Sequence, residues 1–449
     1  MPVKTWIIQP YHPSNVTLRL NVALRKKVYM LPLTVTTLAR LVLDLGHEAR
    51  VIDENVEAIP LEENMPDIAL ITAMTPTAPR AYKIADELRR RGVTVVLGGI
   101  HPTVAPQEAS EHADAVVIGE AEPVIERLLE DARRGELQPA YEAVGGADLS
   151  ALEPPKWELL RSRRYQWIKS VEEIRGCAYD CSFCSANKIF GSRVRCRPVE
   201  RVVEELASMK EHFAFFTAND IAANKSYARR LFHALTPLGK KWFSQASVEM
   251  AEDEELVELA ARSGCVGLLV GFESLVGHHL KKARHAFEHD RRAYYEKIIE
   301  TFHKYRIALI GCFVFGLDEQ DEEIFGLTKD FIEETNIDVP QLTVATPYPG
   351  TKMREELDGQ GRLLPLGWEY YDAVRTTIVP LQMPLEMLRE GYDWIGQTLF
   401  SYGALWHRVR RSRDYLQERY RSYGVVLPIN LVYRKLYELS HEPPRVDPA

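Results

Sequence analysis

Three cysteines stand close together in the segment RGCAYDCSFC, namely Cys177, Cys181 and Cys184. Their spacing, Cys-x3-Cys-x2-Cys, places three thiolates on one short stretch of chain. A structural zinc site needs four ligands and usually takes them from two separated pairs, and no second pair stands nearby. A [4Fe-4S] cluster also usually takes four thiolates, so three would leave one iron with an open coordination position. The pattern therefore indicates a chemical metal centre, at which a small molecule can bind the metal.

The composition is that of an ordinary globular protein. The chain has 449 residues, of which 46% are hydrophobic, and this predicts two or three domains with cores of their own. A formal net charge of −8 disfavours a partner bound through a nucleic-acid backbone. No apolar run approaches the ~18 residues of a membrane-spanning helix, and the first residues do not resemble a secretory signal, so we expect a cytoplasmic protein. The other cysteines, Cys196, Cys265 and Cys312, are expected to be buried.

The first third of the chain alternates strands with helices. Apolar, β-branched runs predict strands, and segments with helical periodicity lie between them. The strands are expected at 5–10, 48–54, 67–74, 93–99 and 113–120, and the helices at 34–46, 78–92 and 121–134. Five buried strands separated by helices predict a parallel, doubly wound, flavodoxin-like α/β domain over 1–140. Residues 136–165 carry Gly-Gly and Pro-Pro pairs and are interpreted as irregular, with a linker at 141–165.

A strand is expected at 166–176, just before the cysteines, and the alternation resumes after them. The later strands are expected at 212–220, 242–249, 266–274, 307–317 and 338–350, with helices between them, for example at 252–263 and 321–335. This predicts a second α/β domain of parallel strands over 166–360, whose functional groups should lie at the carboxyl ends of the strands. Residues 361–449 are helical, aromatic and rich in arginine, which favours a helical cap on the second domain. The alternative for this cap is an interfacial helix that contacts a membrane or a lipid-like substrate.

The cysteine segment, with Phe183 just before its last cysteine, resembles the signature of the radical S-adenosylmethionine (SAM) superfamily. The resemblance implies a partial (βα)6 barrel and a [4Fe-4S] cluster held by the three cysteines. It implies that SAM chelates the open iron and is cleaved by one electron to a 5′-deoxyadenosyl radical. Four later segments resemble the family's strand-end motifs in the same order, at 215–220, 245–249, 267–274 and 346–351. By this resemblance the residues around SAM are Phe183, Asn219 or Asp220, Ser247, Glu249, Gly271 and Glu273, and Tyr348 faces the substrate.

The first of these motifs, at the second strand, departs from the family pattern. Many relatives carry an acidic pair or Gly-Gly-Glu where this chain has Thr217-Ala218-Asn219-Asp220. Both Asn219 and Asp220 can accept a hydrogen bond from an ammonium group. The sequence leaves open which of the two points inward.

Residues 95–109 and 113–122 resemble the cobalamin-binding domain that precedes the radical SAM domain in one large subfamily. By this resemblance, Gly98 and Gly99 let the backbone approach a large flat ring, and Thr72 and Thr75 offer hydroxyl groups at the end of a central strand. The signature Asp-x-His-x-x-Gly, whose histidine binds cobalt, is absent, and His101 is not assigned as a ligand. The alternative is that this domain keeps the fold without binding a cofactor.

The resemblance implies a cobalamin-dependent methyltransferase that acts on an unactivated carbon or phosphorus of a small-molecule or lipid-like substrate. It also implies an external electron donor such as a flavodoxin or ferredoxin. Two alternatives stay open. One is a radical SAM enzyme of the same architecture that cyclises, joins carbons or transfers another part of SAM. The other is a non-enzymatic iron–sulfur or cobalamin sensor.

Overall fold

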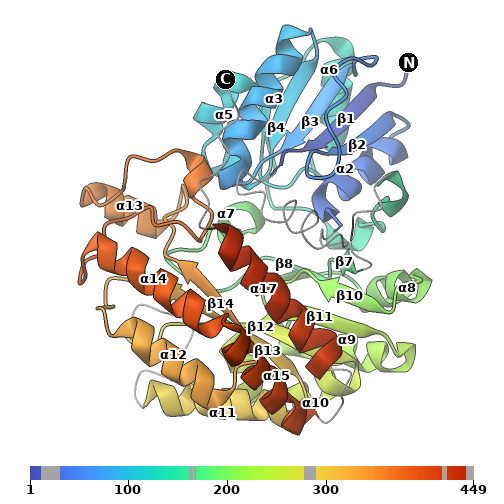
Figure 1. The fold of residues 1–449 in the computed structure, drawn as a ribbon. Coiled ribbons are helices and arrows are strands. Elements are labelled where there is room, and N and C mark those ends of the chain that lie inside the picture. Colours follow the sequence, from blue (N-terminus) through green and yellow to red (C-terminus); the bar gives the residue numbers. More distant parts are fainter. Residues whose placement is uncertain (12–30, 161–164, 166–167, 278–289, 417–421, 441–449) are drawn as a thin grey trace.

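Two six-stranded parallel sheets form the body of the protein (Figure 1). The computed structural model describes residues 1–11, 31–160, 165, 168–277, 290–416 and 422–440. The N-terminal sheet and its helices, in blue and cyan, lie at one end of the molecule. The second sheet and its helices, from green to red, lie at the other end. The predicted architecture of a doubly wound domain, a partial barrel and a helical C-terminal region is confirmed.

The N-terminal sheet has the strand order β2-β1-β3-β4-β5-β6. The order 2-1-3-4-5 is that of a flavodoxin-like sheet, as predicted. The strands are β1 (Lys4–Gln9), β2 (Glu48–Asp53), β3 (Ile68–Thr72), β4 (Thr94–Gly98), β5 (Ala115–Ile118) and β6 (Ala140–Glu142). The sixth strand corrects the prediction of five strands followed by an irregular segment. Only Tyr141 of β6 is buried, so this strand is too short to show an alternating pattern in the sequence.

Helices cover both faces of this sheet because its buried strands alternate side chains between the two faces. Ala69 and Ile71 of β3 pack on one side with α3 (Ala78–Arg90) and α5 (Pro106–His112). Ile68 and Leu70 of the same strand pack on the other side with α2 (Leu33–Asp44) and α6 (Ile125–Arg134). The carboxyl ends of the strands therefore stay uncovered by these helices and are free to build a site.

The second sheet has the order β14-β13-β12-β11-β10-β7, and all of its pairs are parallel. Its strands are β7 (Lys169–Val171), β10 (Phe213–Phe216), β11 (Lys241–Ala246), β12 (Cys265–Glu273), β13 (Ala308–Phe315) and β14 (Val339–Val344). Its outer helices are α8 (Val199–Ser208), α9 (Lys225–Leu235), α10 (Glu254–Arg262), α11 (Arg291–Lys304) and α12 (Ile324–Thr335). Of the strand expected at 166–176, residues 166 and 167 lie outside the described part of the chain.

Alternate residues of these strands pack against the outer helices in one large core. Trp242 of β11 is fully buried, stacks on Phe232 of α9 at 5.2 Å between ring centroids, and meets Phe216 of β10 edge-on at 5.5 Å. The residues between them, such as Phe243 and Gln245, must point to the concave side. The sequence alternation thus separates a core-facing set from a set that can line the inside of the barrel. Cys265 and Cys312 are buried as expected, whereas Cys196 is only half-buried.

A two-stranded antiparallel ribbon, which the sequence did not indicate, carries the cysteine segment. Its strands are β8 (Ile174–Arg175) and β9 (Arg195–Cys196), and Arg175 pairs with Arg195. The short helix α7 (Ala186–Phe190) lies between them, directly after Cys184. Strands of two residues are too short for any periodicity, so only the structure reveals that the segment is a loop closed at its base.

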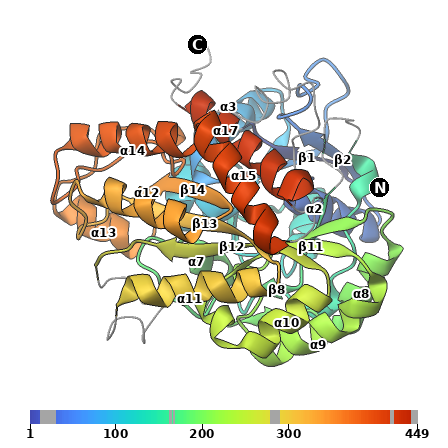
Figure 2. The ribbon, with the colours of Figure 1, turned by 60° about the horizontal axis from the view of Figure 1, so that its bottom comes forward.

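The C-terminal helices pack across the second sheet. They are α14 (Leu385–Leu399), α15 (Tyr402–Leu416) and α17 (Leu427–Ser440), in red and orange in Figures 1 and 2. Residues 417–421 of the helical region predicted there lie outside the described residues. Leu405 and Val409 of α15 share a small core with Ala308 and Val339 at the starts of β13 and β14. No helix in the described part of the chain is long and apolar enough to cross a membrane.

Asp338, which is fully buried just before β14, fastens this cap to the barrel. Its carboxylate accepts hydrogen bonds from the Leu309 backbone at 2.8 Å and from the hydroxyl of Tyr415, and His303 Nε2 lies 3.1 Å away. Asn430 of α17 donates to its backbone carbonyl at 2.8 Å. The carboxylate therefore joins a strand, an outer helix and α15 of the cap, and the backbone carbonyl of the same residue adds α17.

We expect Asp338→Ala to lower the free energy of unfolding by about 3 kcal/mol, because it leaves several buried donors without an acceptor. The matched control is Asp330→Ala, whose carboxylate pairs with Lys329 on the surface and should cost no more than about 0.5 kcal/mol. Chemical denaturation of both variants measures the difference. Equal stabilities of the two variants would show that the cap does not depend on this contact.

Candidate active site

The three cysteines lie on a loop whose base is fixed by close backbone packing. Gly176 has a φ of +87°, and a Cβ there would lie 2.2 Å from the carbonyl oxygen of Arg193, so no other residue fits. Within the loop, the Cys184 amide donates to the Cys181 carbonyl at 3.2 Å. The loop also joins the end of the barrel, because the Met353 amide donates to the Ser182 carbonyl at 3.0 Å. The base and the tip of the loop are therefore both held.

The chemistry of this loop fits a cubane cluster. Cys177 is buried, Cys181 is half-buried and Cys184 is exposed, so the thiols reach from the protein interior to a cavity wall. Within the described ranges, no three His, Cys, Asp or Glu side chains converge as ligands of a single metal ion. A cluster differs from a single ion because each thiolate binds a different iron and the thiolates are spread around the cubane. Three soft sulfur donors on one loop suit iron–sulfur chemistry.

A group of polar side chains lies next to this loop, inside the barrel. Tyr179, from within the cysteine segment, donates its hydroxyl to Ser247 Oγ at 3.4 Å. Burial raises the pKa of Tyr179, and the negative charges of Glu249 and Asp220 raise it further, so both carboxylates lie near its hydroxyl. Ser247 and Asp220 are buried. The structure thus brings together three of the residues that the family resemblance assigned to SAM.

Glu249 is the most informative member of this group. Both of its carboxylate oxygens are buried, and within the described residues neither accepts a hydrogen bond of good geometry, although the hydroxyls of Ser247 and Tyr179 lie close enough to lower its pKa. Burial, together with the charge of Asp220, raises the pKa of Glu249 above its ordinary value. A buried carboxylate without partners is costly unless a ligand supplies the missing donors. The ammonium group of SAM is a donor of this kind, so the group fits the predicted cofactor.

The structure also separates the two residues that the sequence could not distinguish. Asp220 is buried, accepts a hydrogen bond from the Ala222 amide at 2.9 Å and acts on Glu249 through its charge. Asn219 is only half-buried. Asp220 is therefore the member that lies with Tyr179 and Glu249.

Gly271 and Glu273 lie at the carboxyl end of β12, where its pairing with β13 shifts register. Glu273 has a φ of +62°, which is unusual for a residue other than glycine. A Cβ on Gly271 would lie 2.3 Å from Glu273 Oε1, so the glutamate side chain folds back over this glycine. Such local strain is typical of functional sites. Phe183, by contrast, lines a separate cavity of ≈260 Å³ with residues such as Gly316, Leu317 and Leu357.

A larger cavity of ≈470 Å³ separates the N-terminal sheet from the cysteine loop. Its floor is the carboxyl edge of that sheet and includes Thr72, Gly98 and Gly99. Its opposite wall includes Cys184 and α7. Apolar side chains line most of the remainder, among them Leu38, Leu70, Val96, Ile125 and Ile189. One cavity therefore touches both the predicted cobalamin edge and the predicted cluster loop.

The floor of this cavity fits a cofactor that approaches the backbone closely. Gly99 has a φ of +97°, and a Cβ there would lie 2.8 Å from Thr72 Oγ1 and 2.9 Å from the Ala73 carbonyl oxygen. This position therefore requires glycine. Broad apolar walls and a flat glycine edge suit a large ring such as a corrin.

Thr75, the fourth residue assigned to cobalamin, does not line this cavity. It is buried in the short turn Thr75–Thr77, where its Oγ1 lies 3.4 Å from His101 Nδ1. His101 itself is fully buried, and burial lowers its pKa. The His101 ring lies 6.1 Å from the ring of Tyr82 of α3, between centroids, and His101 does not line the cavity either.

Tyr348, which the family resemblance placed toward the substrate, lies on the turn after β14 near Cys184: burial raises its pKa to about 12, with Asp372 and Cys184 adding to the shift.

Three residues beside the site carried no sequence signal of their own. Glu120, Glu122 and Arg175 form part of the large cavity's wall. Glu120 and Glu122 belong to the segment 113–122, which the sequence analysis identified only by its resemblance to cobalamin-binding domains. Their partner is 53 or more residues away in the chain, so sequence reasoning could not pair them.

Comparison with known proteins agrees with this geometry. Residues 22–129 match the B12 binding domain family, and residues 171–331 match the Radical SAM superfamily. The chain is 30% identical over 371 residues to bacteriochlorophyllide d C-12(1)-methyltransferase of Chlorobaculum tepidum, with 80% of each chain covered. It is 27% identical over 373 residues to bacteriochlorophyllide d C-8(2)-methyltransferase of the same organism, with 78% of this chain and 82% of the relative covered.

Among solved structures, the fold is similar to that of TsrM, a radical SAM methyltransferase from Kitasatospora setae with cobalamin and a [4Fe-4S] cluster bound. The TM-score is 0.62 at 18% identity, over 81% of this chain and 76% of TsrM. The two family matches fall on the two parallel sheets, one on each side of the large cavity. The chain therefore belongs to the radical SAM superfamily, among the members that carry a B12-binding domain ahead of the radical SAM domain, with a [4Fe-4S] cluster, SAM and cobalamin as cofactors.

Proposed function

We propose that the protein is a methyltransferase that moves a methyl group from SAM, by way of cobalamin, to an unactivated carbon of a small molecule. The observation that carries this proposal is the shared cavity. Cys184 lines the same space as Thr72, Gly98 and Gly99, so the two cofactor regions face each other with no layer of protein between them. A methyl donor and a radical source must reach one substrate carbon, and this arrangement supports that requirement.

The residues of the chain have distinct parts in this proposal. When bound, the cluster supplies an electron, SAM supplies a carbon radical and cobalamin supplies the methyl group. Cys177, Cys181 and Cys184 hold the cluster and leave one iron open. Glu249 and Asp220 bind the ammonium group of SAM, and the apolar walls of the cavity exclude water from reactive carbon species. Gly99 keeps the floor low enough for a flat ring.

The relatives suggest the class of acceptor. Two of them are named for methyl transfer to bacteriochlorophyllide d, at positions C-12(1) and C-8(2). We propose an alkyl carbon on a large ring of this kind as the acceptor, with a small reduced electron carrier such as a flavodoxin or ferredoxin as the partner. The mainly apolar cavity is compatible with such an acceptor.

The products of SAM test this function directly. Methyl transfer consumes one SAM as methyl donor and a second as radical source, so S-adenosylhomocysteine and 5′-deoxyadenosine should form in comparable amounts. Mass spectrometry of a reaction with methyl-labelled SAM and bacteriochlorophyllide d as probe measures both products and the label in the acceptor. 5′-Deoxyadenosine without S-adenosylhomocysteine would indicate non-methylating radical chemistry instead. No cleavage of SAM at all would favour a sensor.

The cluster has its own test. Cys184→Ala removes one of three thiolates, so we expect loss of most of the bound iron and sulfide and a fall of SAM cleavage to background. Cys196→Ala is the matched control, because this half-buried cysteine lies on β9 outside the loop. It should retain the iron and sulfide content of the wild type. A Cys184→Ala protein that kept its cluster would contradict the assignment.

Glu249 gives a pH-dependent prediction. Its raised pKa means that the free protein keeps a proton on this carboxyl at mildly acidic pH, which a cationic ligand must displace. The affinity of the cluster-loaded protein for SAM should therefore rise with pH above 4.5 until Glu249 is ionised in the free protein. Glu249→Gln should bind SAM about tenfold more weakly and with a flatter pH profile.

Calorimetric titration of SAM at several pH values measures both effects. Glu252→Gln is the control, because Glu252 is exposed and lies outside the polar group. An unchanged affinity and pH slope in Glu249→Gln would remove Glu249 from the SAM site.

A further inference from the structure

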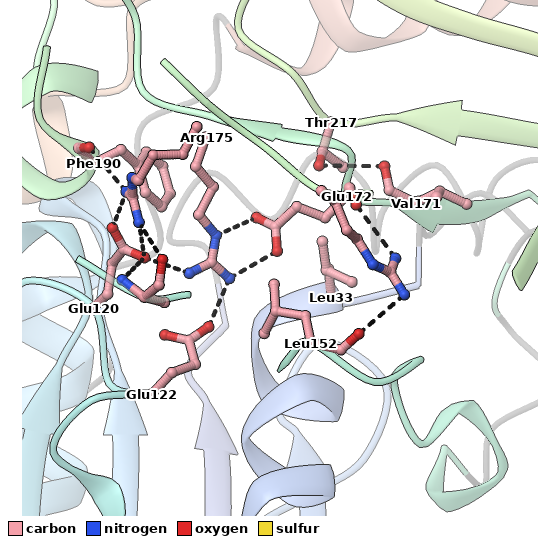
Figure 3. Close-up of polar contacts among 12 residues, drawn as sticks. Leu33, Glu120, Glu122, Leu152, Val171, Glu172, Arg175, Phe190 and Thr217 are labelled. Carbon is pink, nitrogen blue, oxygen red and sulfur yellow. Dashed lines mark hydrogen bonds and ion pairs between the residues drawn. The ribbon is translucent and has the colours of Figure 1, made fainter. Parts of the chain in front are cut away.

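One wall of the large cavity is a network of buried charges that crosses the boundary between the two sheets (Figure 3). Arg175, at the end of β8, donates to Glu120 at 2.6 Å and to Glu122 at 2.6 Å. It also makes a bidentate contact with Glu172, at 2.8 Å through Nε and 2.7 Å through Nη2. Glu120 and Glu122 follow β5 on the corrin-facing edge of the N-terminal sheet. A single guanidinium therefore joins that edge to the strand that leads into the cysteine loop.

Arg195 of β9 extends the network from the other side of the loop. It forms an ion pair with Glu120 and donates to the carbonyl oxygens of Phe190 at 3.0 Å and Ala147 at 2.9 Å. The Ala147 amide in turn donates to Glu120 at 3.0 Å. Both strands of the ribbon that closes the cysteine loop are thus tied to one glutamate of the N-terminal sheet.

The burial and charge of the network make it costly to disturb. The side chains of Arg175 and Glu120 are only 7% and 2% exposed. Burial tends to raise the pKa of Glu120, but the hydrogen bonds from Arg195 and Arg175 outweigh it and hold this pKa below its ordinary value. The network contains three carboxylates and two guanidinium groups, all within ion-pair distance of a partner. Removal of one partner leaves a buried charge uncompensated.

The network lies at both ends of the cysteine loop, and this position indicates its role. Arg175 stands two residues before Cys177, and Phe190 ends the helix that follows Cys184. The ring of Phe190 lies under the Arg175 guanidinium, 5.8 Å from its centroid. Both ends of the cysteine loop are therefore attached to the network, while its glutamates and Cys184 line the same cavity.

A second contact holds the same two parts of the molecule together at another place. Trp368, beyond the barrel, donates its indole N–H to Glu108 of α5 at 2.9 Å, and Arg354 lies over the Trp368 ring at 4.7 Å. Loss of the first contact would therefore not separate the two parts. It would let the cysteine loop shift relative to the corrin-facing edge while contacts such as this one remain.

We propose that Arg175, with Glu120 and Glu122, is a positioning clamp that sets the distance between the cluster loop and cobalamin. The planar guanidinium group of arginine suits this positioning role, because its N–H donors point in fixed directions. It can hold three carboxylates in one plane, and an ammonium group cannot. The inference rests on cobalamin occupying the large cavity, and it does not depend on the identity of the methyl acceptor.

The test uses the full-length protein loaded with cluster and cobalamin. Arg175→Lys keeps the charge but loses the fork, and Glu122→Gln keeps the shape but loses one charge. Glu130→Gln is the matched control, since Glu130 of α6 makes exposed ion pairs with Arg133 and Arg134 on the same helix. The readouts are iron content, cobalamin affinity, the dipolar interaction between cob(II)alamin and the reduced cluster in pulsed EPR, and the ratio of 5′-deoxyadenosine to S-adenosylhomocysteine.

We expect Arg175→Lys to keep its iron and to bind cobalamin about tenfold more weakly. The dipolar interaction should become weaker and more broadly distributed, because it falls with the cube of the distance between the two centres. The ratio of 5′-deoxyadenosine to S-adenosylhomocysteine should rise about tenfold, because misplaced centres cleave SAM without transfer. Glu122→Gln should change the same readouts in the same direction and by less, and Glu130→Gln should match the wild type.

A wild-type dipolar interaction and product ratio in Arg175→Lys, with only a lower unfolding temperature, would overturn the proposal and reduce the network to a structural contact. If Arg175→Lys loses its cluster, the dipolar interaction and the product ratio of Glu122→Gln, compared with those of the wild type, test the proposal instead. If SAM yields no S-adenosylhomocysteine in any variant, the methyltransfer function fails, but the dipolar interaction still reports on the clamp.

Discussion

The buried contact between Arg175 and the glutamates of the N-terminal sheet is the interaction on which the arrangement of this enzyme depends. Charges with side-chain exposures of a few per cent lose most of their hydration, so they are tolerable only where each finds a partner of opposite sign. Here the partners come from different domains. The N-terminal sheet edge is left with unpaired acids if the cysteine ribbon moves away, and the ribbon is left with unpaired arginines. The folded protein therefore needs the two sheets in this relative position, because only there are the buried charges compensated. The linker between the domains does not set this position.

This constraint explains why the chemistry can be divided between two folds. Parallel sheets expose their functional groups at the carboxyl ends of the strands. In this protein the floor of the large cavity is one such edge, and the opposite wall is the loop that carries Cys184. Neither sheet could form the cavity alone. The glycine edge at Gly99 supplies a low floor, the cysteine loop supplies the metal ligands, and the ion network between them keeps the gap at a fixed width.

The sequence was sufficient for those parts of the structure that depend on local pattern. Apolar β-branched runs identified five strands of each sheet closely, and the Cys-x3-Cys-x2-Cys spacing identified the loop, since its chemistry lies within eight residues. The sequence-based prediction failed where a contact joins distant residues or where a strand is too short to show a pattern. The strand β6 has one buried residue, and the ribbon β8–β9 joins residues about twenty positions apart. Thr75 was assigned together with Thr72, but in the turn after β3 its Oγ1 lies 3.4 Å from His101 Nδ1. Glu120 and Arg175 are 55 positions apart in the chain, so no local pattern could pair them.

The buried carboxylates show how the same fold gives one residue type several different tasks. Asp338 is satisfied by a backbone amide and a tyrosine hydroxyl, and it holds the cap. Glu173 is fully buried and has one oxygen bonded to the Ala218 amide, and burial raises its pKa well above the ordinary value. Glu120 is ionised because two guanidinium groups surround it. Among the described residues, Glu249 alone has both oxygens buried without a hydrogen bond. The other buried acids have at least part of their hydrogen bonding from the chain itself. Glu249, beside the cysteine loop, does not, so we expect its carboxylate to bind a cation that the chain does not provide.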